Sequence, residues 1–393
     1  MDDHITRRRF LQHTACGLAG TAVLGSVLSP GQGWGSPKAE PMLYRPLGKT
    51  GLQVSALGYG VMRLTEPAVL FQALDRGINY FDTAHTYQNG NNEKMLGRVL
   101  KEHGRKKVFI ATKIPPFNRL SGTKILASTA SMERKFEESL RRLQTDYVDV
   151  LFLHAISDPA WPQNEQLLNF CRRLKQAGKA RFVGISCHEA GKTYEQILEN
   201  AMQAGIYDVF LVTLNFKSPP AHLELLKRVH KAGIGTVAMK TQAGGYAQKS
   251  GPGVTAHQAA LAWALASGVA DCAVPGMTNR RQLQDNAAAL SLKISTREHV
   301  ILHKYAALIQ DRFCRRCGEC LGTCRSGVAI PDINRALMYR EGYSDHDLAR
   351  NTYNEFSATE NASQCLTCTD PSCRCTGDIT LPARMRVAHN LLS

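Results

Sequence analysis

From about Met42 to Leu292, short apolar segments alternate with longer segments whose apolar positions recur at helical spacing. Such alternation is typical of βαβ units around a parallel sheet. The predicted strands are VSALGYGVM, NYFDTAHTY, KVFIATKI, VDVLFLHA, RFVGISCH, VFLVTLNF, IGTVAMK and DCAVPGM. The predicted helices include NEKMLGRVLKEH, SMERKFEESLRRL, NEQLLNFCRRLKQAG, LELLKRVHKAG and AHQAALAWALASG.

Eight strands and eight helices in about 250 residues predict an α/β protein with a (β/α)₈ TIM barrel. An open doubly wound sheet is the main alternative, and it is disfavoured because no G-x-G-x-x-G follows the first predicted strand. We therefore predict three parts: a signal peptide and linker over residues 1–40, the barrel over 42–292, and a small, mostly α-helical domain over 293–393.

Four ionisable residues end neighbouring predicted strands or begin the loop beyond one. Asp82 and Tyr87 follow the second strand, Lys113 ends the third and His154 ends the fourth. In a parallel barrel the chemistry lies at these carboxyl ends. A carbonyl that accepts hydride needs an acid near its oxygen, and Tyr87 is the predicted acid/base. We expect Lys113 to lower the pKa of Tyr87, Asp82 to keep Lys113 charged, and a neutral His154 to orient the substrate.

The segments that hold these four residues, FDTAHTY…NNEKMLG, ATK and LFLHA, resemble the catalytic tetrad segments of the aldo/keto reductase family. GISCH, TLNF and VPGMTNRRQLQDN resemble the cofactor segments of that family. The resemblance covers residues 42–292. It implies reversible hydride transfer between NADPH and an aldehyde or ketone.

The resemblance also implies which residues contact the cofactor. Ser186 and Asn215 would hold the amide of the nicotinamide. Lys240, in AMKTQAGG, is a candidate for the pyrophosphate, and Gly244 and Gly245 would allow a close approach of the backbone.

The segment PGMTNRRQLQDN would lie along the adenosine phosphate, at the usual phosphate end of such a barrel. Gly276 and Gln282 stand where the best-known mammalian members of the family carry a lysine and an arginine. Arg280 and Arg281 are close enough in sequence to replace them, and Asn286 matches an asparagine on the adenine side. The sequence leaves the choice between NADP(H) and NAD(H) open.

Eight of the 12 cysteines lie in the last fifth of the chain. The first run, Cys314, Cys317, Cys320 and Cys324, has the spacing C-x₂-C-x₂-C-x₃-C that is typical of ferredoxin [4Fe–4S] sites. In that arrangement the fourth cysteine binds a second cluster. A second run follows, with the irregular spacing C-x₂-C-x₄-C-x-C; it contains Cys365, Cys368, Cys373 and Cys375.

We therefore predict two [4Fe–4S] clusters in a helical dicluster ferredoxin-like domain. One ligand set contains Cys314, Cys317, Cys320 and Cys375, and the other contains Cys324, Cys365, Cys368 and Cys373. Structural zinc is the main alternative, because paired C-x₂-C units also bind zinc, and disulfides are a second alternative. The single cysteines Cys16, Cys171, Cys187 and Cys272 are predicted to be small buried apolar residues.

The N-terminal stretch TRRRFLQ (Thr6–Gln12) precedes a short apolar run rich in glycine and alanine. This pattern resembles a twin-arginine (Tat) export signal, and the alternative is a basic amphipathic helix. Tat export carries folded proteins, so clusters assembled in the cytoplasm would reach the periplasm or cell envelope. No clear A-x-A cleavage site is visible, so an uncleaved signal acting as a membrane anchor stays open.

The net charge is +15 and the pI is about 9.3. The basic residues are spread along the chain and interleaved with acids, as in KEHGRKKVF. This distribution indicates a solvated basic surface and not a nucleic-acid-binding stripe.

The sequence thus predicts an NAD(P)H-linked oxidoreductase that acts on a small carbonyl or alcohol substrate, with iron–sulfur clusters for electron transfer or structure. A redox partner protein and the Tat export machinery are the expected partners. The alternative is a barrel kept as a binding scaffold, with the cysteine domain serving for docking or electron transfer.

Overall fold

The computed structural model describes residues 42–120, 123–189, 191–247 and 253–393. The predicted signal peptide and linker at 1–40 and the buried position predicted for Cys16 lie outside these residues.

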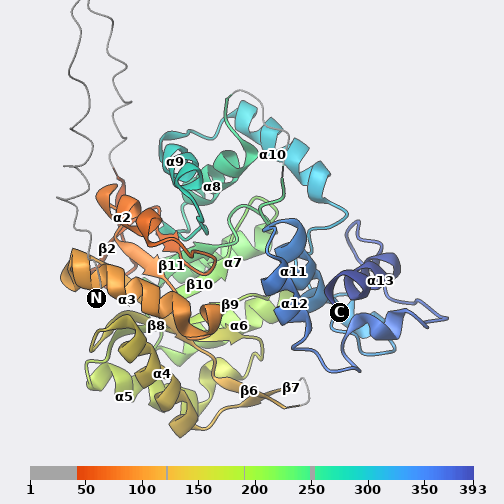
Figure 1. The fold of residues 1–393 in the computed structure, drawn as a ribbon, viewed down its shortest axis with the longest axis horizontal. Coiled ribbons are helices and arrows are strands. Elements are labelled where there is room, and N and C mark those ends of the chain that lie inside the picture. Colours follow the sequence, from red (N-terminus) through yellow and green to blue (C-terminus); the bar gives the residue numbers. More distant parts are fainter. Residues whose placement is uncertain (1–41, 121–122, 190, 248–252) are drawn as a thin grey trace, which may run out of the picture. The chain divides into compact units, whose positions relative to one another are not determined.

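Eight parallel strands form the central sheet (Figure 1). Their order is β3 (Tyr59–Gly60), β4 (Tyr80–Asp82), β5 (Phe109–Ile114), β8 (Val148–Ile156), β9 (Ala180–Cys187), β10 (Val209–Thr213), β11 (Gly235–Met239) and β12 (Cys272–Ala273). Two parallel bridges, Leu57 to Ala273 and Gly60 to Gly276, link the first strand region to the last. The predicted α/β barrel is confirmed, and a doubly wound sheet is excluded because its two edges would not meet.

One helix follows each strand and packs on the outside of the sheet (Figure 1). These helices are α2 (Pro67–Asp75), α3 (Asn91–His103), α4 (Thr129–Leu143), α5 (Glu165–Gln176), α6 (Gly191–Ala204), α7 (Pro220–Lys231), α8 (Ala256–Ala266) and α9 (Arg280–Ala288). Local sequence fixes several of their starts: Ser128 and Asn164 cap α4 and α5 with their side chains, and Thr255 forms a capping box with Gln258.

Two hydrophobic layers hold the barrel together. Side chains such as Val150, Phe152 and Leu211 fill its interior, while the larger layer packs the helices against the outside of the strands. Burial of this kind stabilises by about 25 cal/mol for each Å² of apolar surface removed from water. Cys171, Cys187 and Cys272 are buried in these layers, which confirms their predicted role.

Two antiparallel hairpins were not predicted from the sequence. The first joins β1 (Tyr44–Pro46) to β2 (Gln53–Ser55), and it divides the predicted single strand VSALGYGVM into β2 and β3. The second joins β6 (Phe117–Leu120) to β7 (Thr123–Leu126), between β5 and α4. Short 3₁₀ helices complete this part: η1 (Tyr87–Gly90), η2 (Arg105–Lys107), η3 (Trp161–Gln163) and η4 (Ala289–Ser291).

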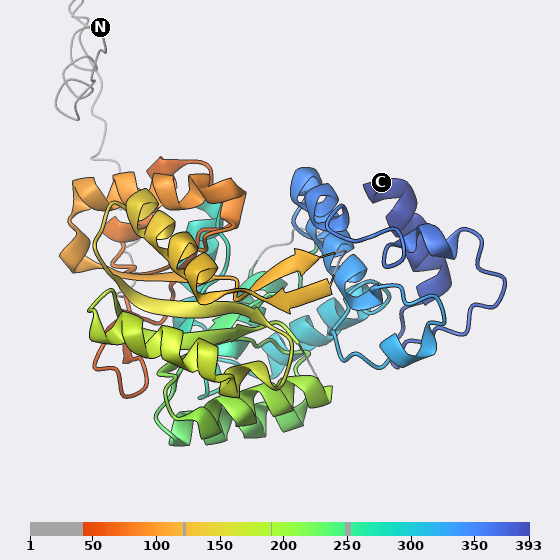
Figure 2. The same ribbon diagram turned by 90° about the horizontal axis from the view of Figure 1, so that it is seen from below.

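The remaining described chain is helical, as predicted (Figure 2). It contains α10 (Thr296–Ile309), η5 (Leu321–Thr323), α11 (Ile330–Glu341), α12 (His346–Tyr353), η6 (Ala362–Cys365) and α13 (Leu381–Leu392). A second hydrophobic core joins α11–α13 to Ala243, Tyr246 and Ala256 of the barrel segment. Among the described residues, no helix is both long and apolar enough to cross a membrane.

Candidate functional site

The four residues predicted for catalysis lie together at the carboxyl ends of β4, β5 and β8. Asp82 is the last residue of β4 and Tyr87 begins η1 directly beyond it. Lys113 pairs in register with Phe152, two residues before His154 on the neighbouring strand. Parallel pairing therefore brings residues that are far apart in sequence to one rim of the barrel.

Lys113 is the centre of this group. Its Nζ donates to Asp82 Oδ1 at 2.5 Å, to the Thr83 carbonyl oxygen at 2.6 Å and to the Tyr87 hydroxyl at 3.1 Å. An ammonium has three donors, so all of them are used. The Lys113 side chain is only 1% exposed, and its geometry is fixed without solvent.

The pKa shifts follow from this burial. Burial lowers the pKa of Lys113, but Asp82 and Tyr87 together raise it further, so the pKa of Lys113 ends above its ordinary value and the amine stays charged. Burial raises the pKa of Tyr87, and Lys113 acts in the opposite direction. The sequence-based expectation that Lys113 gives Tyr87 a lowered pKa is therefore wrong in its net direction, because loss of solvent outweighs the neighbouring cation. Tyr87 is held as a protonated phenol.

His154 faces the same space. Its ring lies edge-on to the Tyr87 ring with 6.0 Å between centroids. Burial lowers the pKa of His154 well below its ordinary value, and Lys113 and Lys124 act in the same direction. The imidazole is therefore neutral, and its N–H is available as a donor to a substrate oxygen.

His188 extends this row and was not predicted. Its ring lies 6.1 Å from that of His154, its Nδ1 is buried without a hydrogen-bond partner, and burial lowers its pKa well below the ordinary value. It follows the strand segment GISC, so its position after a strand end was a signal in the sequence.

A cavity of about 1120 Å³ contains Asp82 and Tyr87 at one end. It runs past β11 to α9 and is lined by four of the predicted cofactor residues: Lys240, Gly276, Gln282 and Asn286. Arg281 also lines it. Arg280, at the exposed start of α9, does not.

Several side chains that were predicted to bind the cofactor already form hydrogen bonds within the protein. The Ser186 hydroxyl accepts from the Ala155 amide at 2.8 Å, and the Asn215 amide donates to the Lys240 carbonyl at 3.2 Å. Gln282 Oε1 accepts from the Thr278 amide at 2.7 Å. Ser186 and Asn215 do not line the larger cavity.

Helix α11 contributes a wall of this cavity that sequence reasoning missed. Tyr339 and Tyr343 line the cavity, with their rings 5.5 Å apart. Arg63, from the loop after β3, lies 4.7 Å from the centroid of the Tyr343 ring and forms an ion pair with Asp345 at 3.7 Å. The segment that follows the first cysteine run therefore helps to enclose the catalytic group.

The two cysteine runs are joined by hydrogen bonds that cross between them. Near Cys317, the Arg315 guanidinium donates to the Thr376 hydroxyl at 3.2 Å, and the Cys317 sulfur lies 3.8 Å from the same hydroxyl. Near Cys324, the Arg374 amide donates to the Thr323 hydroxyl at 3.1 Å. The Ser372 hydroxyl, next to Cys373, also donates to the Thr323 carbonyl at 2.8 Å. Cys375 is therefore adjacent to a residue bonded near Cys317, and Cys373 is adjacent to a residue bonded near Cys324.

The pKa shifts of the thiols show the same division into two groups of cysteines. Burial raises the pKa of Cys320 to about 12, and Cys314, Cys317 and Cys375 act in the same direction. Burial raises the pKa of Cys365 to about 11, and Cys324, Cys373 and Cys368 act in the same direction. The neighbours of each thiol are those of the predicted ligand sets.

Backbone amides also face two of these sulfurs. The Arg316 amide donates to Cys314 Sγ at 3.4 Å and the Gly377 amide donates to Cys375 Sγ at 3.3 Å. In the described part of the chain, no group of three His, Cys, Asp or Glu residues converges as the ligands of a single metal ion would. Each cysteine of a [4Fe–4S] site binds its own iron, so such a set has no single point of convergence.

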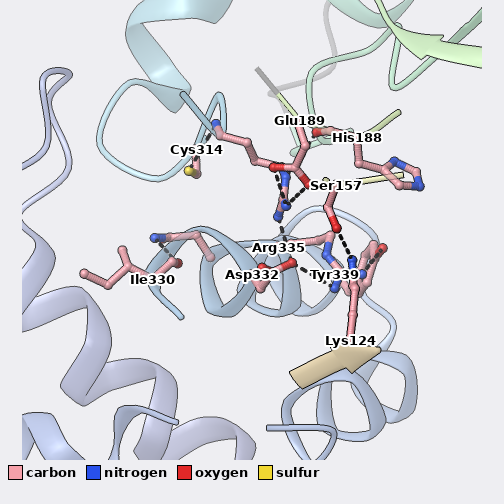
Figure 3. A network of polar contacts seen from close by, with 11 residues as sticks. Lys124, Ser157, His188, Glu189, Cys314, Ile330, Asp332, Arg335 and Tyr339 are labelled. Carbon is pink, nitrogen blue, oxygen red and sulfur yellow. Dashed lines mark hydrogen bonds and ion pairs between the residues drawn. The ribbon is translucent and has the colours of Figure 1, made fainter. Parts of the chain in front are cut away.

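Arg316 connects the first cysteine run to the barrel. Its guanidinium donates to the His188 carbonyl at 3.1 Å, to the Glu189 carboxylate at 3.0 Å and to Asp332 at 2.9 Å. Figure 3 shows Glu189 and His188 on one side of this network and Asp332 and Arg335, both on α11, on the other. The cysteine segment is therefore fixed against the strand ends by buried charges.

The profile of the aldo/keto reductase family matches residues 57–253. Aldo-keto reductase AFTS1 of Alternaria alternata is 32% identical to this chain over 254 residues, which are 53% of this chain and 68% of that protein. L-galactose dehydrogenase of Arabidopsis thaliana is 29% identical over 285 residues, 63% of this chain and 88% of that protein.

Solved structures agree with this relationship. An aldo-keto reductase from Klebsiella pneumoniae in complex with NADPH aligns with a TM-score of 0.55 and 26% identity, covering 67% of this chain and 95% of that one. The holo form of aldo-keto reductase AKR11C1 from Bacillus halodurans aligns with a TM-score of 0.55 and 25% identity, covering 67% and 96%. The family profile ends before the first clustered cysteine, Cys314.

Proposed function

The chain belongs to the aldo/keto reductase family and is an oxidoreductase, and we propose that it transfers hydride reversibly between NAD(P)H and a small carbonyl or alcohol substrate at Tyr87. The observation that carries this proposal is the set of three hydrogen bonds from Lys113 to Asp82, Thr83 and Tyr87. They hold an acidic hydroxyl beside a fixed positive charge in a buried site.

Each residue of the catalytic group has its own role in the proposed reaction. The Tyr87 phenol gives its proton to the carbonyl oxygen during reduction and takes it back during oxidation. Lys113 stabilises the phenolate that remains, and Asp82 keeps Lys113 charged and oriented. Neutral His154 donates a hydrogen bond to the same oxygen and fixes its direction toward Tyr87.

The larger cavity fits a dinucleotide. It is lined by Gly60, Gly244, Gly245 and Gly276, where a ligand can approach the backbone closely. Thr241 offers a buried hydroxyl that has no hydrogen-bond partner among the residues that the structure describes. Lys240, Arg281, Gln282 and Asn286 would hold the cofactor along this cavity. Nicotinamide, when bound, would supply or accept the hydride at the carbonyl carbon. The Klebsiella relative was solved with NADPH, which supports the same cofactor class here.

The test is Tyr87→Phe. We expect turnover of a test aldehyde with NADPH to fall by about 10² to 10⁴-fold, because the proton donor is lost, while the fold is kept. Tyr44→Phe is the matched control, since that hydroxyl bonds the Gly77 carbonyl on an exposed hairpin away from the cavity. Undiminished turnover by Tyr87→Phe would exclude the acid/base role.

We further propose that the cysteine segment holds two [4Fe–4S] clusters, one on Cys314, Cys317, Cys320 and Cys375 and the other on Cys324, Cys365, Cys368 and Cys373. The support is the C-x₂-C-x₂-C-x₃-C spacing together with the hydrogen bonds that cross between the runs. Amide donors to Cys314 and Cys375 are the kind of contact that tunes a cluster potential. The clusters would exchange single electrons with a redox partner protein or hold the segment in shape.

One experiment distinguishes electron transfer from a structural role of the clusters. The chain is purified without oxygen, its iron and acid-labile sulfide are measured, and NADPH is then added. If about eight irons are present and the visible absorption of the clusters bleaches on NADPH addition, the clusters are connected to the barrel chemistry. Clusters that stay oxidised while aldehyde is consumed would be structural or serve for docking. Zinc in place of iron would reject the cluster proposal.

We also propose export through the Tat pathway to the periplasm or cell envelope, on the basis of TRRRFLQ and the apolar run after it. Replacing Arg7 and Arg8 by lysine should leave the protein in the cytoplasm. Unchanged fractionation of that variant would reject the Tat route.

A further inference from the structure

The turn that carries Tyr87 has an unusual backbone. Directly after Tyr87, Gln88 has a φ of 49° and Asn89 a φ of 53°, and Gly90 follows with a φ of 84°. Glycine adopts such angles freely, whereas two successive residues with side chains rarely do, because the Cβ atom approaches the backbone. Backbone of this kind persists only where surrounding contacts fix it. Contacts from outside the turn therefore hold Tyr87 in place.

The Arg142 guanidinium, in the last turn of α4, contacts both ends of this turn. Its Nη1 donates to the His85 carbonyl oxygen at 2.9 Å, two residues before Tyr87. At the other end it packs on Gly90 so closely that a Cβ atom there would overlap the guanidinium. The Arg142 side chain is 14% exposed, so water competes little for these contacts.

Two carboxylates hold Arg142 in this position. Glu93, in the first turn of α3, is fully buried, and its Oε2 lies 3.3 Å from Arg142 Nη1. Glu138 Oε1 lies 2.5 Å from Nη2. The other oxygen of Glu93 accepts from the Thr112 hydroxyl at 2.7 Å, and Thr112 directly precedes Lys113 on β5. The buried Glu93–Arg142 pair therefore connects the catalytic turn to the strand that carries Lys113.

Further hydrogen bonds fix the same turn from other sides. Gln88 Nε2 donates to the carbonyl oxygens of Met62 and Leu64, at 3.0 Å and 2.9 Å. The His85 amide donates to the Lys113 carbonyl oxygen at 3.1 Å. The turn is thus bonded to the loop after β3, to β5 and, through the guanidinium, to α4.

Glu93 and Arg142 lie behind the turn, and neither is among the described residues that line the larger cavity. The distance that they influence is the 3.1 Å between Lys113 Nζ and the Tyr87 hydroxyl. Since two other hydrogen bonds already fix Lys113 Nζ, a displaced turn moves the hydroxyl away from the ammonium. The stabilisation of a phenolate falls with this separation, and a misplacement of about 1 Å costs up to about 10²-fold in rate.

We infer that Glu93 and Arg142 are positioning residues: their buried ion pair holds the strained turn so that the Tyr87 hydroxyl stays beside Lys113, oriented for proton transfer. The inference rests on the proposed function, because it concerns the same proton transfer. It predicts a loss in kcat with little change in KM, since the cofactor cavity is left as it is. It also predicts that the effect of Arg142 disappears when the Tyr87 hydroxyl is absent.

The test is the steady-state kinetics of Arg142→Met in the intact, anaerobically purified chain, with NADPH and a test aldehyde. We expect kcat to fall by about 10- to 100-fold and KM for NADPH to stay within about twofold. The rise of alcohol oxidation with pH should move to higher pH, because Lys113 no longer lies close enough to lower the pKa of Tyr87. Arg173→Met is the matched control: Arg173 lies on α5 in an exposed pair with Glu133, and its loss should change neither kcat nor the pH profile.

A double variant tests whether Arg142 acts through Tyr87. When Arg142→Met is added to Tyr87→Phe, the residual turnover should fall by less than about twofold, because no hydroxyl is left to position. A merely structural contribution would lower turnover by the same factor with and without the hydroxyl. Equal factors in the two backgrounds, or native kcat in folded Arg142→Met, would overturn the inference.

Should Arg142→Met not fold, Glu93→Gln decides, since glutamine keeps the acceptor for Thr112 and loses the charge that holds Arg142. Its kcat should fall at least about threefold with the same shift of the pH profile, and a native kcat and profile would overturn the inference. Arg142→Lys keeps the charge, and its kcat should exceed that of Arg142→Met by at least about threefold.

The proposed function and the positioning role fail in different ways. Undiminished turnover by Tyr87→Phe would reject the proposed function itself. Diminished turnover by Tyr87→Phe together with native kinetics of Arg142→Met would reject the positioning role alone.

Discussion

Glu189, two residues beyond the end of β9, forms an ion pair with Arg316 of the first cysteine run, with 3.0 Å between Oε1 and Nη2. The two side chains are 19% and 10% exposed, so the pair is largely shielded from water. It joins the strand ends of the barrel to the loop that begins the proposed cluster site. The pair therefore links the barrel to the cysteine segment, and we expect a substitution in one of them to affect the stability of the other.

Removing the Glu189 charge should destabilise the protein. Glu189→Ala leaves Arg316 with Asp332 as its one carboxylate partner, and we expect a loss of about 2–4 kcal/mol in the free energy of unfolding. The measurement is thermal unfolding of the anaerobically purified chain. Glu165→Ala removes the exposed pair with Arg172 and should change stability by less than about 0.5 kcal/mol. Similar unfolding midpoints for the two variants would contradict a structural role for the Glu189 pair.

The raised pKa of Tyr87 determines how activity depends on pH. Reduction needs the phenol, which persists above the ordinary pKa of about 10, so kcat/KM for reduction should be flat between about pH 6 and 9. Oxidation needs the phenolate and should rise with pH over this range. Lys113→Met removes the group that lowers the pKa of Tyr87, and oxidation at pH 9 should fall by at least about tenfold.

The control for this experiment is Lys227→Met, which changes a lysine of the outer surface. Circular dichroism should confirm that Lys113→Met is folded, because Asp82 loses its ion-pair partner. An oxidation rate that keeps its native pH profile in folded Lys113→Met would show that Lys113 does not govern Tyr87.

Acid should weaken the fold through the buried histidines. His154 and His188 have pKa values well below 6.5 when folded, so between those values and 6.5 the unfolded chain binds more protons. The free energy of unfolding therefore falls as pH falls below about 6.5, by up to about 1.4 kcal/mol per pH unit for each histidine. His188→Gln should make this fall shallower in unfolding experiments between pH 7 and 5. The control His303→Gln, at an exposed position of α10, should leave the slope unchanged.

Cysteine substitutions test the division into two sets. Cys375→Ser should perturb the same cluster as Cys314→Ser, because Thr376 bonds Arg315. Cys373→Ser should perturb the same cluster as Cys324→Ser, because Ser372 bonds Thr323. Each variant should lose up to about four of eight irons and one of two electron paramagnetic resonance signals of the reduced protein. Cys171→Ser, in the barrel core, is the control for cysteine loss as such. If Cys375→Ser removed the signal that Cys324→Ser removes, the division would be wrong.

Much of the fold followed from local pattern. Seven of the eight predicted barrel strands lie where the apolar runs placed them, whereas the first, VSALGYGVM, divides between β2 of a hairpin and β3. Asp82, Lys113 and His154 lie on β4, β5 and β8, at or close to their carboxyl ends. A strand end is visible in the sequence because apolar residues give way to polar ones there. The parallel arrangement then brings successive ends to one rim, so the catalytic group could be assembled without coordinates.

Other features depended on contacts between distant segments. Tyr339 of α11 and Tyr343, two residues beyond the end of that helix, line the catalytic cavity, and Arg316 reaches Glu189. Nothing in the local sequence of these residues points to the barrel. The β6–β7 hairpin is equally hard to predict, since its strands are short and lack a marked apolar alternation. Such contacts are set by packing and not by periodicity.

The sequence by itself determined the barrel, the catalytic group and the two cysteine runs, because spacing along the chain specifies strands, helices and ligand patterns. The tertiary structure alone decided the protonation of these groups and what surrounds them. Tyr87 shows the reason: Lys113 was visible as a neighbour, but the loss of water that raises the pKa of Tyr87 arises only when the barrel rim and the surrounding chain pack around it.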